Sequence, residues 1–444
     1  MDKSRMLPAA VLVLILALGC GKSSSGIPDN SDLWPFTDNG KLGYVDSSGK
    51  IIVNAAFDAA LGFSDGLAAV KVSDRWGYID TKGQLVINPQ FDEAAPFAEE
   101  LAAVKVKDRW GYIDKKGGYT INPQFDHADV FSDGLAGVLV GDRFGYVDKK
   151  GQLAINPQFD GGWKFTEGLA AVKVGERWGY VDKEGKIVVN PQFDYATSFS
   201  EGLAVVASGN RGGYVDKEGK FVITPQFDNA DEFHEGMAAV RVGDKWGYVD
   251  KKGKFVVNPQ FDGAGRFADG RGEVRVGSRS GYVDATGKFI INPQYEQASM
   301  FNNGLAYVQE ESGKSGYIDK AGKFVWQDKS GSVKKTMADL RTIATAWEAR
   351  ATDTNSYQID GIGDGIVSLD QVAGALSPTY IKSLPRLDSW SSPFVFQIRG
   401  GGRSYLLGSA GPNRRTPGLA TPDPDDIVFA DGNFTQFPKG IAAN

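Results

Sequence analysis

Histidine, cysteine and clustered carboxylate side chains are the groups in this sequence that could carry acid–base, nucleophilic or metal chemistry. The 444 residues include one cysteine, Cys20, and two histidines, His127 and His234, which stand far apart in the chain. Nucleophilic catalysis needs a nucleophile, a base and a group that orients the base. Each histidine is interpreted as a surface or loop residue instead of a general base, and two histidines with one cysteine cannot assemble a Cys/His zinc cluster. We therefore expect a protein that is not an enzyme.

Aspartate side chains recur at one turn position. An aspartate first and a glycine fourth is typical of a type I turn, in which the carboxylate caps its own turn. We interpret the recurring aspartates in this way, with a ladder of cation sites as the alternative and a glycosidase-type carboxylate pair ranked below both. The recurring aspartates are Asp46, Asp80, Asp114, Asp148, Asp182, Asp216, Asp250, Asp284 and Asp319.

These aspartates belong to a sequence unit that is repeated nine times. A Gly-Tyr step recurs every 34 residues from Gly43 to Gly281, and a ninth follows at Gly316 after one inserted residue. A period of this size is typical of an array in which each unit buries its apolar face against its neighbours. The phenylalanines that recur once per unit, such as Phe193, are interpreted as core.

Each unit predicts three antiparallel strands. In one copy these are 169–174, 178–182 and 186–190; Pro191 is expected to end the third, because proline cannot donate to a ladder. An irregular link, 193–202, follows. We predict a mostly β fold, an open array of nine three-stranded 34-residue units over residues 33–327. A closed, propeller-like toroid is the alternative. The atypical first and last units are expected to be caps.

Recognition is expected where the units differ, because loops on a rigid scaffold usually carry it. The link is that place, and its residues at equivalent positions range from glycine to charged and aromatic types. We predict that the links line up along one edge of the array and contact a protein or a polysaccharide. The candidate binding residues are His127, Trp163, Tyr195 and Arg266.

The repeated sequence resembles a known family. Arg75-Trp-Gly-Tyr-Ile-Asp80, Asn88-Pro-Gln-Phe-Asp92 and Phe63-Ser-Asp-Gly-Leu-Ala68 are similar to the WG-repeat (KWG-repeat) proteins of bacteria. The resemblance covers about two thirds of the chain. It implies β-rich modules that bind or scaffold, with no shared catalytic residues.

The N-terminus is typical of a targeting segment. Lys3 and Arg5 precede an apolar run, 7–18, which is too short to span a bilayer comfortably. Residues 1–20 resemble a bacterial lipoprotein signal peptide, which implies lipidation of Cys20 and a membrane anchor. Residues 21–32 are expected to be a flexible tether. An ordinary secretory signal is the alternative.

The composition changes after Gln327. Residues 328–335 are a polar linker in this interpretation, and 336–350 predict an amphipathic helix with Leu340, Ile343, Ala344 and Trp347 on one face. A shorter helix is expected over 368–376. Strands over 394–398 and 404–409 are expected to flank a hairpin turn at 400–402. Residues 336–444 therefore predict a small α+β domain.

This domain resembles the soluble part of the major pseudopilin of type II secretion. The similar residues include Asp339–Ala344, Asp388–Phe394, Ser409–Asn413 and Asp425–Ile427, and the long apolar helix that polymerises pseudopilins is missing. The resemblance implies a calcium site in the C-terminal loop and pseudopilin-like partners. A solvated acidic turn is the alternative. The implied calcium ligands are Asn413, Asp423, Asp425 and Asp426.

Charge and targeting bound the function. A net charge of −6 gives no broad basic surface for nucleic acid. We expect a lipid-anchored binding or scaffold protein of the bacterial cell envelope, at the outer membrane. The alternatives are an accessory of a type II secretion or type IV pilus-like machine and, ranked lowest, an enzyme acting on envelope polysaccharide.

Overall fold

The computed structural model describes residues 32–38, 40–354, 365–376, 379–382, 384–388, 392–399, 404–409, 411, 426–430 and 433–436. The chain divides into two compact units. The first unit runs to Val308 and includes Tyr317–Trp326. The second comprises Gln309–Gly316 and the chain from Gln327 onward, and it has a hydrophobic core of its own.

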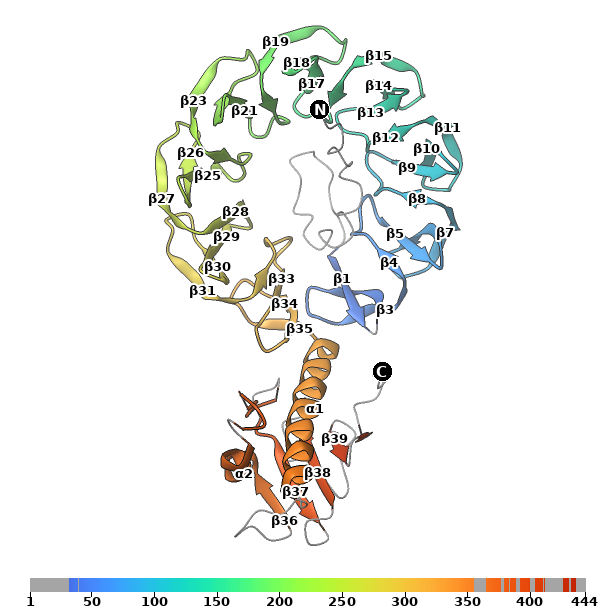
Figure 1. Cartoon of the computed structure of the whole chain (residues 1–444). Helices are drawn as coiled ribbons and strands as arrows, with labels where there is room; N and C mark the ends of the chain where they lie inside the picture. The colour runs from blue at the N-terminus through green and yellow to red at the C-terminus, as the bar shows by residue number, and fades with distance from the viewer. Residues whose placement is uncertain are drawn as a thin grey trace, which may run out of the picture. The chain divides into compact units, whose positions relative to one another are not determined.

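The described residues 32–328 form nine antiparallel sheets, which follow one another in chain order around a ring (Figure 1). The first sheet has three strands, β1-β2-β3, and each of the other eight has four. The short strands such as β8 and β12 lie toward the centre of the ring, and β7, β15 and β23 lie at its rim (Figure 1). The predicted mostly β array of nine repeated units is thus confirmed.

Each strand position in the sheet recurs around the ring. The innermost strands are β4 (Ala59–Ala60), β8 (Glu93–Ala94), β12 (His127–Ala128), β16 (Gly161–Gly162), β20 (Tyr195–Ala196), β24 (Asn229–Ala230), β28 (Gly263–Ala268) and β32 (Gln297–Ala298). The next strands outward are β1 (Leu33–Asp38), β5 (Leu67–Val72), β9 (Leu101–Val106), β13 (Leu135–Val140), β17 (Ala170–Val174), β21 (Ala204–Ser208), β25 (Met237–Val242), β29 (Arg271–Val276) and β33 (Ala306–Gln309).

The two outer positions complete each sheet. The third strands are β2 (Lys41–Asp46), β6 (Arg75–Asp80), β10 (Arg109–Asp114), β14 (Arg143–Asp148), β18 (Arg177–Val181), β22 (Arg211–Val215), β26 (Lys245–Asp250), β30 (Arg279–Val283) and β34 (Ser315–Ile318). The outermost strands are β3 (Ile51–Phe57), β7 (Leu85–Phe91), β11 (Tyr119–Phe125), β15 (Leu153–Phe159), β19 (Ile187–Phe193), β23 (Phe221–Phe227), β27 (Phe255–Phe261), β31 (Phe289–Tyr295) and β35 (Phe324–Asp328).

The innermost strand corrects the prediction of three strands and an irregular link. Tyr195 and Ala196, at the start of a link, pair with Ala207 and Val206 of β21. The link therefore opens the next sheet instead of only joining two sheets. Two residues are too few to show the alternation by which strands are recognised in sequence.

The third predicted strand also continues further than expected. Pro191 lies inside β19 instead of ending it. The strand is an edge strand, and its pairing with β18 shifts register between Trp178↔Phe193 and Tyr180↔Val189. Proline is tolerated at such bulges and edges because no ladder hydrogen bond is required of its nitrogen.

The glycine after the tryptophan is required by this bulge. A Cβ atom built on Gly179 would lie 2.4 Å from the carbonyl oxygen of Val189 and 2.7 Å from the nitrogen of Pro191. The same approach recurs at Gly77 and Gly247. The outermost strand therefore crosses the third strand at a distance that only glycine allows.

The hydrophobic core lies between successive sheets. Tyr180 and Phe193 of one sheet form one cluster with Phe199, Val206 and Val215 of the next. The rings of Tyr180 and Phe199 are 4.8 Å apart, and both side chains are fully buried. The described sheets thus bury their apolar side chains against their neighbours, as expected for a repeat array. The recurring phenylalanines are part of this core.

A buried tyrosine hydroxyl also joins each sheet to the next. The Tyr180 hydroxyl donates to the carbonyl oxygen of Thr197 at 3.0 Å, and that of Tyr78 donates to Ala95 at 2.8 Å. The residues that accept these bonds lie in the following link. Burial raises the pKa of Tyr180, so the hydroxyl stays protonated and keeps donating.

Removing one of these hydroxyls should weaken the contact between two neighbouring sheets, which we call a junction. Tyr180→Phe leaves the ring in place and leaves the Thr197 carbonyl without this donor, so we expect a loss of about 1–2 kcal/mol in the free energy of unfolding. Urea denaturation measures it. Tyr119→Phe at the exposed rim is the control and should stay within about 0.5 kcal/mol of wild type. Equal effects of the two substitutions would contradict the role of the hydroxyl.

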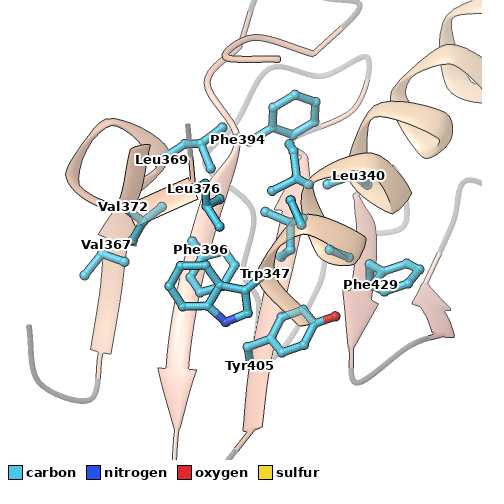
Figure 2. Packing of buried hydrophobic residues seen from close by; sticks show 14 of the residues in the cluster. Leu340, Trp347, Val367, Leu369, Val372, Leu376, Phe394, Phe396, Tyr405 and Phe429 are labelled. Carbon is cyan, nitrogen blue, oxygen red and sulfur yellow. The ribbon is translucent and has the colours of Figure 1, made fainter. Parts of the chain in front are cut away.

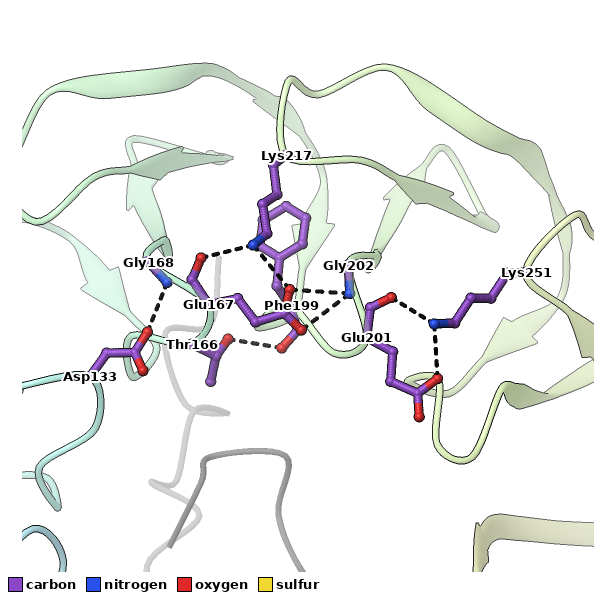
Figure 3. A network of polar contacts seen from close by, with 9 residues as sticks. All are labelled: Asp133, Thr166, Glu167, Gly168, Phe199, Glu201, Gly202, Lys217 and Lys251. Carbon is purple, nitrogen blue, oxygen red and sulfur yellow. Dashed lines mark hydrogen bonds and ion pairs between the residues drawn. The ribbon is translucent and has the colours of Figure 1, made fainter.

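Polar contacts also connect neighbouring sheets (Figure 3). The carboxylate of Glu167 accepts from the backbone N–H of Gly202 at 3.1 Å, and Lys217 lies 3.2 Å from it. Asp133 accepts from Gly168 at 2.7 Å in the preceding junction. Each acidic side chain thus accepts a hydrogen bond from a backbone N–H group of the next sheet. This structural role explains why an acidic residue recurs at this position of the repeat.

The turn aspartates behave as predicted. The Asp80 Oδ1 atom accepts from the backbone N–H groups of Lys82 and Gln84, each at 2.9 Å. The N–H of Gly83 donates to the Asp80 carbonyl oxygen. Asp114 makes the equivalent contacts. The carboxylate therefore caps its own turn.

The first and last sheets contact each other. The Trp34 Nε1 atom donates to the carbonyl oxygen of Asn302 at 3.1 Å, and the Tyr317 hydroxyl donates to that of Pro35 at 2.6 Å. Trp34 and Tyr317 also share a buried cluster with Phe36 and Leu305. These are the contacts of the closed toroid, the alternative to the open array. The atypical terminal units pack on each other and are not caps facing solvent.

The second unit is a helix packed on an antiparallel sheet (Figure 2). Trp347 of the long helix is fully buried and its ring lies 4.4 Å from that of Phe396. The five-stranded sheet has the order β36-β37-β38-β39-β40. The elements are α1 (Lys329–Thr354), β36 (Gly365–Ser368), α2 (Leu369–Leu376), β37 (Val395–Arg399), β38 (Ser404–Ser409), β39 (Ile427–Ala430) and β40 (Asn433–Gln436).

The predicted elements of this unit are present, with one correction. The face with Leu340, Ile343 and Trp347 is buried as expected, and β37 pairs with β38. The segment 328–335, however, is not a linker, because β35 ends at Asp328 and α1 begins at Lys329. Its polar composition hides a helix start. The helices in the described part of the chain are too polar or too short to cross a membrane.

Candidate functional site

At two positions around the ring, the residue that begins the innermost strand lies against an aromatic residue of the preceding sheet. The His127 ring is 5.7 Å from that of Trp110, and the Tyr195 ring is 6.1 Å from that of Trp178. This placement follows from the two-residue innermost strand, which fixes the link backbone against the next sheet. The variable side chains are therefore held on a rigid frame.

Three aromatic rings from two sheets form one cluster. Trp163 and Trp178 stack with centroids 6.1 Å apart and an angle of 16° between their planes. Tyr195, from the next sheet, meets Trp178 at 65°. We call Trp163, Trp178 and Tyr195 the aromatic cluster. Trp163 and Tyr195 keep 43% and 44% of their surface exposed.

A hydrogen bond fixes the orientation of the cluster. The Trp163 Nε1 atom donates to the carbonyl oxygen of Ala196 at 3.0 Å, across the junction between the two sheets. The indole is thus oriented before any ligand arrives, and its only donor is already used. The cluster therefore offers a ligand the faces and edges of its rings and the hydroxyl of Tyr195.

Charged groups of both signs flank the aromatic cluster. Lys173 of β17 pairs in register with Trp178, and its ammonium lies 3.9 Å from Glu176. On the following sheet, the negative charge of Glu232 contributes, after burial, to raising the pKa of Tyr195. Glu232 Oε2 lies 3.8 Å from Nε2 of the buried His234. The surroundings therefore contain donors and acceptors but no single dominant charge.

His127 belongs to a separate arrangement on an earlier sheet. Its Nε2 atom lies 3.1 Å from Asp129 Oδ1, and the side chain is half-exposed. The hydrogen bond with Asp129 raises the pKa of His127 above 6.5, against the opposing effect of burial. Lys105 lies 6.0 Å over the Trp110 ring and 2.7 Å from Glu93.

The titration of His127 tests this geometry. Because its pKa in the folded protein lies above the unfolded value, the contact with Asp129 stabilises the fold below pH 6.5 and is lost as the pH rises through the folded pKa. NMR titration of the imidazole protons should give a pKa above 6.5, and Asp129→Asn should lower it. An unchanged pKa in that variant would show that Asp129 is not the cause.

The predicted binding residues fall into three places. Trp163 and Tyr195 come together in the aromatic cluster, as members of neighbouring sheets. His127 lies on Trp110, two sheets before that of Tyr195. Arg266 lies in β28, two sheets after that of Tyr195, and is half-buried. That the links form one contact surface stays a prediction.

Sequence reasoning missed Trp178, Lys173 and Glu232. Trp178 was visible as the variable aromatic position, but its contact with Tyr195 depends on the unrecognised innermost strand. Where serine occupies the position equivalent to Trp178, the side chains Ser280 and Ser315 are buried.

The predicted lipidation and calcium residues are mostly not described. Cys20, Asn413, Asp423 and Asp425 lie outside the described residues, and Asp426 is buried just before β39. Within the described residues, histidine, cysteine and carboxylate side chains form no group of three that could hold a metal ion. The calcium site therefore stays a prediction.

Solved structures of several kinds are similar to the ring. A crystal structure of a eukaryotic initiation factor aligns with 66% of this chain and 95% of its own, at 12% identity and a TM-score of 0.49. BamB from Moraxella catarrhalis aligns with 59% of this chain and 93% of its own, at 12% identity and a TM-score of 0.37. Hsv2p from Kluyveromyces lactis covers 51% and 92%, at 8% identity and a TM-score of 0.33. No curated protein matches the sequence.

The family model of the WG-containing β repeat matches the array eight times. The matched residues are 43–76, 76–110, 110–143, 144–178, 178–211, 213–246, 246–279 and 281–314. Together they cover more than half of the chain, and each contains the close crossing of glycine and edge strand. The chain therefore belongs to the WG-repeat family.

Proposed function

We propose that this protein is a lipid-anchored, non-enzymatic binding or scaffold protein of the bacterial cell envelope, whose ring contacts a protein or a glycan through its links. One observation carries the proposal: Trp163 and Tyr195, from links of neighbouring sheets, expose their rings side by side with Trp178. Exposed aromatic rings on a rigid frame are typical of binding surfaces. The anchor is the lipidated Cys20, which would hold the ring at the outer membrane.

Retention of envelope material tests the proposal. Full-length protein is immobilised and incubated with solubilised envelope, and bound protein and polysaccharide are quantified. Wild type and Tyr119→Ala should retain the same component, and the double variant Trp163→Ala/Tyr195→Ala should lose it. Tyr119 is the matched control because its ring is 46% exposed at the rim, outside the links. Equal retention by all three proteins would contradict a binding role for the links.

The second unit supports an alternative function. The support is the order of its elements: the helices α1 and α2 and the paired strands β37 and β38 match those predicted from the sequence for residues 336–409. On this alternative the protein is an accessory of a type II secretion or pilus-like machine and docks through residues 336–444, with calcium at Asn413, Asp423, Asp425 and Asp426. Binding of the full chain to purified pseudopilins, with and without calcium, tests it. Calcium-dependent binding that survives the double link variant would favour this alternative.

A further inference from the structure

We propose that the aromatic cluster, with Lys173 and Glu232 beside it, is a binding site for an uncharged pyranose oligosaccharide. This inference rests on the proposed function and narrows its ligand to one class. The C–H face of a pyranose ring is apolar and stacks on an aromatic ring, while its hydroxyls point outward and need donors and acceptors. The cluster combines both requirements within two neighbouring sheets and the one that follows.

The ring geometry fits successive sugar units. Trp163 and Tyr195 each lie 6.1 Å from Trp178, so at most two such separations lie between the two exposed rings. Neighbouring residues of one oligosaccharide can therefore cover both. The hydrogen bond from Trp163 Nε1 to Ala196 holds the first ring in place. Rings that are ordered beforehand lose little conformational entropy when a ligand binds.

The surrounding charges favour an uncharged, hydroxyl-rich ligand. An ammonium group offers three donors and a carboxylate only acceptors, so Lys173 and Glu232 together can satisfy hydroxyls of either role. Glu176 lies 3.9 Å from the Lys173 ammonium, so the surroundings have no excess of positive charge that would select an anion. At the equivalent aromatic residue Trp110, the chain's own Lys105 lies over the ring, so a cationic ligand would compete with a lysine already present.

A peptide is the less suitable occupant. Proline-rich peptides dock between aromatic rings that also donate hydrogen bonds to the peptide backbone, typically from a tryptophan N–H group. Here the Trp163 N–H is already bound to Ala196 across the junction. The exposed Trp163 ring therefore offers its face, and not an indole donor, to a ligand, which suits a sugar face better than a peptide backbone.

Oligosaccharide titration tests the proposal. Full-length protein is titrated with chitohexaose, cellohexaose and maltohexaose, followed by tryptophan fluorescence and by calorimetry. We expect at least one of the three to bind, with an affinity that salt changes little because the ligand carries no charge. Tyr195→Ala should weaken binding about tenfold, and Tyr195→Phe, which keeps the ring, should bind nearly as wild type. Tyr119→Ala should bind as wild type.

The outcomes separate this proposal from the broader one. Absence of binding to all three sugars, or binding that Tyr195→Ala leaves unchanged, overturns the sugar site. If the envelope component retained by the protein is then a protein whose capture still requires Trp163 and Tyr195, the proposed binding function stands with a peptide surface as its ligand. The unfolding midpoint of Tyr195→Ala is the folding control. A midpoint equal to that of wild type shows that weaker binding comes from loss of the Tyr195 ring and not from misfolding.

Discussion

Gly179→Ala should destabilise the ring by about 3 kcal/mol or more, because the added methyl group has no room. Its position is 2.4 Å from the Val189 carbonyl oxygen and 2.7 Å from the Pro191 nitrogen. Both atoms belong to the backbone of the edge strand, so no side chain can rotate away to make space. The substitution must separate β19 from β18 and expose the cluster that contains Phe193. Urea or thermal unfolding of the full chain measures the loss.

A second glycine supplies the control. Gly62 lies in a link and does not adopt a left-handed backbone conformation, and a Cβ atom added to it would have no neighbour within 4 Å. Gly62→Ala should therefore change the free energy of unfolding by no more than about 0.5 kcal/mol, and can even stabilise the fold by restricting the unfolded chain. If Gly179→Ala behaved like Gly62→Ala, the close crossing of the two strands would be wrong.

Trp34→Ala should open the junction between the first and last sheets, at a cost of about 3–5 kcal/mol. The side chain is buried against Leu305 and Tyr317, and its Nε1 atom donates to Asn302. Hydrogen exchange read peptide by peptide should show faster exchange in β1 and in β32 to β35. The other sheets keep both of their neighbours and should exchange as in wild type.

Trp76→Ala is the matched control for this junction. Trp76 is also buried, but it lies in the second sheet and packs within a cluster made by that sheet and the third. Its removal should accelerate exchange in those two sheets and leave β1 and β33 unchanged. Faster exchange at the terminal sheets in both variants would mean that the ring unfolds as one body and that Trp34 has no special part in closure.

The repeat period predicts most of the frame. Three strands, the turn capped by Asp80 and the buried Phe193 all follow from alternation, turn chemistry and recurrence, which are local properties. The strand Tyr195–Ala196 is too short to show alternation. The continuation of β19 through Pro191 depends on its place at the edge of a sheet, which is a property of the assembled unit.

Closure of the ring cannot be predicted from local sequence patterns. Whether nine sheets meet depends on a small rotation repeated at every junction, and each rotation is set by side-chain packing such as that of Tyr180 on Phe199. The large residues Trp34 and Phe36, where inner units have alanine and valine, marked the terminal units as different. Their actual partner, the last sheet, was not evident from sequence.

Only part of the candidate site could be predicted from the sequence. Variation among the links singled out Trp163 and Tyr195, because recognition concentrates where a repeated frame differs. Their meeting through Trp178 depends on the pairing of β20 with β21, and the approach of Glu232 depends on the next sheet again. His127 and Arg266 were singled out by the same variation, yet they lie on sheets away from the cluster.

The distance between the first and last sheets tests the closed ring most directly. Ser47 and Lys323 are exposed residues beside the contact of Gly49 with Val325. Spin labels are attached at Ser47→Cys and Lys323→Cys in a Cys20→Ser background, and double electron–electron resonance gives their separation. A closed ring predicts roughly 10–20 Å, one to two sheet spacings. A separation of roughly 50 Å or more, as expected when packed sheets about 10 Å apart do not return to the start, would contradict it.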